Sequence, residues 1–107
     1  MELKNLIKRA MEIREKYAQF EKDNTGREWN NLEKMAGFVG DVGDLQKLIM
    51  AKEGRRKDVA NVDEKLAHEL SDCLWCVFVL AKGYGIDIEK EFMKTMDELE
   101  ERIKSKI

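Results

Sequence analysis

The chain has 107 residues and no proline, and its 20 basic and 22 acidic residues give a formal net charge of −2. This composition favours one all-α domain spanning residues 1–107, and the near-balance of charge argues against a nucleic-acid partner, which would require a basic surface. The first residues lack the apolar core of a signal peptide, and the longest apolar run is too short to cross a bilayer, so we expect a cytoplasmic protein without a membrane partner.

Apolar residues recur at helical spacing in the first half of the chain. The first predicted helix covers about residues 3–20 and ends in the polar turn of residues 21–26. The second begins near Glu28 or Trp29 and continues to about Lys52, and a polar, basic connection of residues 53–58 follows it. Three glycines in the second helix, Gly37, Gly40 and Gly43, indicate close packing of another helix, a bulky ligand at the backbone, or both.

Two more helices are predicted in the second half. The third starts near Asn61, which we expect to form a capping box with Glu64, and it runs to about Lys82. Between residues 73 and 81 this helix is apolar on nearly every side, which predicts burial all round and therefore a homo-oligomer that completes a larger helical bundle. The fourth helix covers about residues 88–104. Cys73 and Cys76 lie inside the apolar segment, where buried thiols acting as small hydrophobes are expected.

Two acidic pairs are the most informative feature of the sequence. Asp41 and Asp44 lie three residues apart in the second helix, and Glu69 and Asp72 have the same spacing in the third. Each pair projects from one helix face beside apolar residues, so packing of the two faces would bring four carboxylates together. Such a group needs a cation, and oxygen-only ligands favour Mg²⁺, with Mn²⁺ as a substitute.

The residues around these pairs resemble a known family. The segments 38–45, 69–75 and 85–88 are similar to the MazG-like nucleoside triphosphate pyrophosphohydrolases, and the glycine–acid alternation of the first segment most resembles their dCTP pyrophosphatase-like branch. The resemblance covers roughly residues 29–103. It implies a four-helix fold, a homodimer or tetramer, and Mg²⁺-dependent hydrolysis of a (d)NTP to the monophosphate and pyrophosphate.

The resemblance also assigns roles to the acidic residues. Asp41, Asp44, Glu69 and Asp72 fall on the family's metal ligands, and either Asp41 or Glu69 would orient or deprotonate the attacking water. The chain departs from the family pattern at three points. Gly40 replaces the first glutamate of the motif, the two aspartates replace longer glutamates, and Thr95 and Leu99 stand where many members carry a phosphate-binding Lys and Asn.

A nucleotide substrate would need an apolar slot and cationic groups. Trp29, Phe38 and Trp75 are candidates for the slot, although tryptophan and phenylalanine at helical spacing also serve as plain core residues. Lys47 and Arg55 are candidates for phosphate contacts, the latter in a basic loop that is equally typical of a solvated connection.

The departures leave an alternative function open. In that alternative the chain is a catalytically weak or inactive MazG-like oligomer that keeps a metal site or acts as an interaction or regulatory module. A third interpretation is a helical dimer without metal. The helical period argues against it, because Asp41 and Asp44 share a sector with Gly37 and Gly40 beside the apolar stripe.

Overall fold

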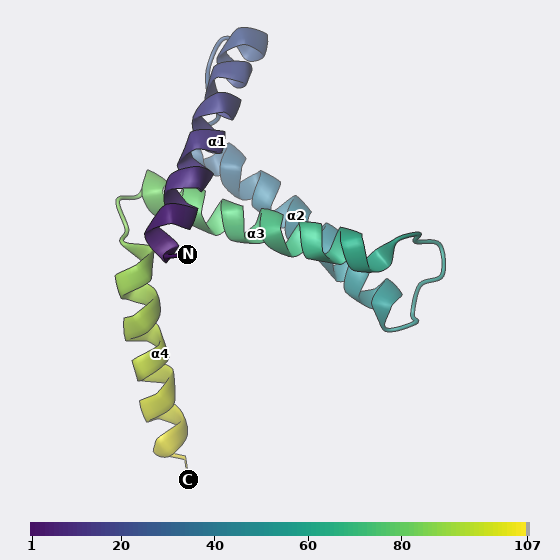
Figure 1. The fold of residues 1–107 in the computed structure, drawn as a ribbon, viewed down its shortest axis with the longest axis vertical. Helices are drawn as coiled ribbons and strands as arrows, with labels where there is room; N and C mark the ends of the chain where they lie inside the picture. The colour runs from purple at the N-terminus through teal and green to yellow at the C-terminus, as the bar shows by residue number, and fades with distance from the viewer. Residues whose placement is uncertain (107) are drawn as a thin grey trace.

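The computed structural model describes residues 1–106, which form four helices joined by short loops (Figure 1). The helices are α1 (Leu3–Thr25), α2 (Asn31–Lys52), α3 (Val62–Gly83) and α4 (Ile88–Lys104). Strands are absent from the described residues, so the predicted all-α fold with four helices is confirmed. Within residues 1–106, no helix combines the length and the apolar run that crossing a bilayer requires.

The helices are arranged around an antiparallel pair. α2 and α3 lie side by side, α1 crosses α3, and α4 extends away from the pair in the direction opposite to α1 (Figure 1). The radius of gyration is 17.0 Å, whereas a compact domain of about 100 residues has roughly 13 Å. A single chain is therefore an open arrangement in which much of each helix faces solvent.

The end of α1 differs from the prediction. Residues 21–25 were expected in a turn but continue the helix, because Asn24 and Thr25 donate side-chain hydrogen bonds to the carbonyls of Phe20 and Glu21 at 2.8 and 2.7 Å. Gly26 then ends α1 in the left-handed conformation, with φ 85°, and its N–H donates to the Lys22 carbonyl. This positive φ favours glycine over any residue with a side chain.

The capping interactions differ from the one expected. Asn30 caps α2, since its side chain accepts from the Glu33 N–H while the Glu33 carboxylate accepts from the Asn30 N–H, which is a complete capping box. The capping box predicted at Asn61 was wrong, because Asn61 has φ 54° and makes no capping hydrogen bond through its side chain. Trp29 consequently lies in the loop before α2.

The core of one chain is small and lies where α1 crosses α3. Its buried apolar residues include Ala10 and Ala18 of α1 and Phe78, Val79 and Ala81 of α3. Residues 73–81 of α3 were expected to be buried on every side, yet Leu74 is 49% exposed. Burial all round is thus not achieved within a single chain.

The glycines of α2 have different surroundings. A Cβ built on Gly37 would lie 3.5 Å from the Trp29 ring, which is an ordinary van der Waals contact, so the loop before α2 packs against the helix at this glycine. At Gly40 and Gly43 nothing in the described part of the chain comes within 4 Å of such a Cβ. A Cβ built on Gly83 would lie 2.9 Å from the side-chain Oδ1 of Asn31, so a larger residue there would require this side chain to move.

Candidate metal centre

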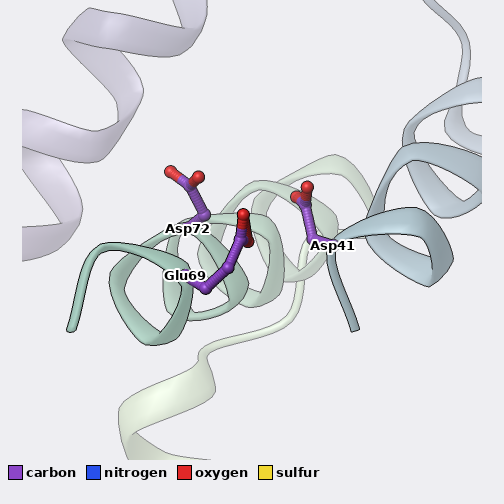
Figure 2. A group of neighbouring side chains, drawn as sticks. All are labelled: Asp41, Glu69 and Asp72. Atoms are coloured by element: carbon purple, nitrogen blue, oxygen red, sulfur yellow. The ribbon is translucent and has the colours of Figure 1, made fainter. Parts of the chain in front are cut away.

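Antiparallel packing of α2 on α3 brings acidic side chains of the two helices together. Asp41 projects from α2, and Glu69 and Asp72 project from α3 at i,i+3 spacing (Figure 2). One carboxylate oxygen of each residue lies within 4.8 Å of the other two, and the Glu69 carboxylate lies between its neighbours in this view (Figure 2). These three residues, called the acidic triad below, form an all-oxygen group of the kind that Mg²⁺ prefers.

The electrostatics of the acidic triad favour a bound cation. Burial raises the pKa of Glu69 above its ordinary value, and the negative charges of Asp41, Asp72 and Asp44 raise it further. Glu69 Oε2 is also fully buried and accepts no hydrogen bond from the described residues. A buried oxygen without a partner is costly, and a divalent ion would both satisfy it and cancel the repulsion. The residues present therefore fit an Mg²⁺ or Mn²⁺ ion.

Asp44 takes a different position from the other predicted ligands. It lies about one turn beyond Asp41 on α2, it is exposed, and it is outside the group of mutually close oxygens. Its charge nevertheless contributes to the raised pKa of Glu69. Three of the four predicted ligands thus converge in the structure, and the fourth lies at the edge of the group.

Two side chains of α3 contact the acidic triad. Cys76 Sγ donates to Asp41 Oδ2 at 3.4 Å, and His68 Nε2 lies 3.2 Å from Asp72 Oδ2 at i,i+4 spacing. Burial, the hydrogen bond to Asp41 and the Asp41 charge raise the pKa of Cys76 to about 12. Both cysteines are free thiols, and this raised pKa disfavours the thiolate that redox chemistry would need.

A pocket of about 500 Å³ adjoins the acidic triad. Asp41 and Asp72 form part of its wall, and four other lining residues are aromatic: Tyr17, Phe20, Trp29 and Trp75. Its volume lies within the range of sites for small organic molecules, which are mostly apolar with a few polar groups at fixed positions. The pocket thus combines an aromatic wall with two of the candidate metal ligands.

Contacts of α1 hold this pocket together. The Arg14 guanidinium donates two hydrogen bonds to the Glu21 carboxylate, and the Trp29 N–H donates to Glu21 Oε1 at 2.7 Å. Burial raises the pKa of Glu21, but the hydrogen bonds from Arg14 and from the Trp29 backbone outweigh it and leave this pKa below its usual value. The paired charges anchor the loop that carries Trp29 against α1.

The predicted substrate contacts fall into two groups. Trp29 and Trp75 line the pocket, while Phe38, Lys47 and Arg55 are not among the residues that line it. The loop that carries Arg55 joins α2 to α3 at the end of the pair that lies away from α1 (Figure 1).

Sequence reasoning missed the cations Arg14 and Lys34 and the aromatic residue Tyr17, all of which line the pocket. Tyr17 is one of the residues of α1 that recur at helical spacing with its apolar residues, and Arg14 and Glu21 share a face of α1 at a spacing of seven residues. This spacing was the available signal for their pairing. Nothing local in the sequence indicated that this face would meet the pocket.

Comparison with known proteins identifies one family. A family model of the MazG nucleotide pyrophosphohydrolase domain matches residues 30–106. The match includes every residue of the acidic triad and Asp44, and it excludes α1. Neither curated proteins nor solved structures gave a match to this chain.

Proposed function

Since the chain belongs to the MazG nucleotide pyrophosphohydrolase family, we propose that it hydrolyses a (deoxy)nucleoside triphosphate to the monophosphate and pyrophosphate in an Mg²⁺-dependent reaction. The single observation that carries this proposal is the acidic triad at the wall of an aromatic pocket. A triphosphate needs divalent charge at its phosphates, and a nucleobase needs a flat apolar surface. The two requirements are met side by side.

The acidic triad would hold the ion, and Asp44, about one turn beyond Asp41 on α2, would contribute its negative charge. Mg²⁺, or Mn²⁺ in its place, supplies charge that neutralises phosphate oxygens and makes a water more acidic. Asp41 or Glu69 would orient the attacking water and accept its proton. The water oxygen would bond to the α-phosphorus as pyrophosphate leaves, so the protein contributes mainly positioning and charge.

The aromatic pocket would hold the base. Trp29 and Trp75 come from different elements and line the same pocket, and the Tyr17 ring packs against Trp75 with centroids 5.7 Å apart. Lys34 is a further lining residue and would approach the phosphate chain, whereas Arg14 is already held by Glu21. Phe38, Lys47 and Arg55 lie outside the pocket of their own chain, so we retain them as candidate contacts from a neighbouring subunit.

We also propose that the chain works as a homo-oligomer. Its accessible surface is 8476 Å², about 2,300 Å² more than a compact monomer of 12.5 kDa exposes. An excess of this size matches what each subunit buries in an obligate dimer. Contact with a second copy of the chain therefore best accounts for the exposed apolar surface.

The α2 seam is the surface we assign to this contact. It consists of exposed apolar residues of α2 that follow one another at separations of three, four or seven positions: Leu32, Met35, Val39, Val42 and Ile49. This spacing is the 3.5-residue period of helices that pack in bundles. Leu70 and Leu74, which α3 leaves half-exposed, would extend the contact so that two α2–α3 pairs form a larger bundle.

The activity is tested by pyrophosphate release from a panel of NTPs and dNTPs with Mg²⁺ or Mn²⁺. We expect release from at least one nucleotide by the wild type, and a loss of at least 100-fold in Asp72→Asn, because one metal ligand is removed. Asp97→Asn, which changes an exposed aspartate on α4, is the matched control and should retain activity. Metal-dependent stabilisation without any release would instead support a non-catalytic metal-binding oligomer.

A further inference from the structure

A thiol supplies the hydrogen bond that Asp41 receives from the protein. Cys76 Sγ donates to Asp41 Oδ2 at 3.4 Å, and within residues 1–106 this is the one hydrogen bond that the Asp41 carboxylate accepts. The contact links α3 to α2, since Cys76 lies on α3 one turn beyond Asp72 and two turns beyond Glu69. Cys76 and Asp41 also line the same pocket.

We propose that Cys76 is a positioning residue, which holds the Asp41 carboxylate in the orientation that binds the divalent ion. This inference rests on the proposed function, since it assigns a role at the same metal centre. Side chains that orient a metal ligand commonly change metal affinity by 10–100-fold when they are removed. A carboxylate has about four lone-pair positions, so one hydrogen bond from the thiol leaves the others free for an ion.

The chemistry of a neutral donor suits this position. A lysine or arginine beside Asp41 would neutralise the acidic triad and compete with the divalent ion for its charge. A thiol restricts the rotation of Asp41 while leaving the charge of the acidic triad unchanged. It is also small, so it takes little of the pocket volume beside the candidate metal ligands.

Cys73 provides the matched control. It lies on the same helix, is half-buried and is also a free thiol, but the described hydrogen bonds do not join it to a carboxylate. Replacing either cysteine by alanine removes one small side chain from α3. If Cys76→Ala weakens metal binding and Cys73→Ala does not, the loss is therefore due to the missing contact with Asp41.

The test is a Mn²⁺ titration of the full chain by calorimetry, alongside the melting temperature without metal. We expect Cys76→Ala to bind Mn²⁺ about 10-fold more weakly than the wild type, at the low end for such residues because S–H is a weak donor. Cys76→Ser keeps a donor and should stay within about threefold of wild type, and so should Cys73→Ala. Equal affinity in wild type and Cys76→Ala would overturn the inference.

Failure of the metal centre itself is a separate outcome. If Cys76→Ala leaves Mn²⁺ affinity unchanged while Asp41→Asn abolishes binding, the metal centre stands and the role of Cys76 is wrong. If the wild type binds no Mn²⁺, both the metal centre and the role of Cys76 are rejected. If Cys76→Ala lowers the melting temperature of the metal-free protein, and Cys76→Ser fails to restore Mn²⁺ binding, Cys76 is a packing residue only.

Discussion

The indole Nε1 of Trp75 donates a hydrogen bond to the backbone carbonyl of Ala10 across 3.0 Å. The two residues are 65 positions apart in the sequence, and their contact joins α3 to α1. The same indole forms part of the pocket wall beside the acidic triad and packs against Tyr17. The crossing of α1 over α3 is thereby coupled to the shape of the candidate binding site.

Trp75→Phe removes this hydrogen bond and keeps an aromatic ring in the pocket. We expect the free energy of unfolding to fall by about 1 kcal/mol, the usual net contribution of one hydrogen bond. Because the ring would lose its fixed orientation, KM for the nucleotide should rise more than kcat falls. Urea unfolding and steady-state pyrophosphate release measure these two effects. An unchanged KM in a destabilised variant would show that Trp75 has only a structural role.

Glu69 gives the protein a distinctive dependence on pH. Burial and the neighbouring carboxylates raise its pKa above the ordinary value of 4.5, so in the absence of metal the wild type loses stability as pH rises through this raised value. Glu69→Gln lacks this titration and should be more stable than wild type near neutral pH, with the difference vanishing below about pH 4. With saturating Mg²⁺ near pH 7 the wild type should instead be more stable than Glu69→Gln, since only the wild type retains all three carboxylate ligands. Thermal unfolding at several pH values, with and without Mg²⁺, checks both signs.

The buried ion pair of α1 should be important for stability. The side chains of Arg14 and Glu21 are only 12% and 8% exposed, so Glu21→Gln would leave a buried guanidinium without its counter-charge at a cost of about 3 kcal/mol. The control is Glu12→Gln at the exposed pair with Arg9, which should cost less than about 0.5 kcal/mol. Urea unfolding at equal subunit concentrations compares the two variants. Similar losses of unfolding free energy in both variants would contradict the claim that burial makes the Arg14–Glu21 pair important for stability.

Val39 lies at the middle of the α2 seam and is 59% exposed in one chain. Val39→Lys would place a charge inside the proposed contact between subunits, where an unpaired charge is costly, so we expect dissociation to monomers at micromolar concentration. Lys8→Glu, at an exposed position of α1 outside the seam, should keep the wild-type assembly. Light scattering gives the masses. A monomeric wild type, or an oligomeric Val39→Lys, would contradict the proposed seam.

Much of the fold was predictable because it depends on local signals. Periodic apolar residues located all four helices, and Asp87 caps α4 close to the expected start, accepting from the Lys90 N–H. The errors arose where competing local interactions decide the outcome. Asn24 and Thr25 extend α1 through bonds to its own carbonyls, and Asn61, which adopts a left-handed conformation, makes no side-chain capping hydrogen bond.

The site was predictable only in part, for a different reason. The i,i+3 spacing placed Glu69 and Asp72 on one face, and the expected packing of α2 on α3 brought Asp41 to them. The wall of the pocket depends on where α1 crosses α3, which is a tertiary contact between distant segments. No local pattern specifies such a crossing, so the contributions of Arg14 and Tyr17 could not be read from the sequence.

The most direct test of the account is a calorimetric titration of Mg²⁺ into the metal-free protein, comparing wild type with Asp72→Asn and Asp97→Asn. The account predicts saturable binding to wild type and to Asp97→Asn, and a loss of at least 10-fold in affinity for Asp72→Asn, because the acidic triad supplies the ligands. Equal affinity in all three proteins, or no binding to a correctly folded wild type, would contradict the claim that these carboxylates form a metal centre.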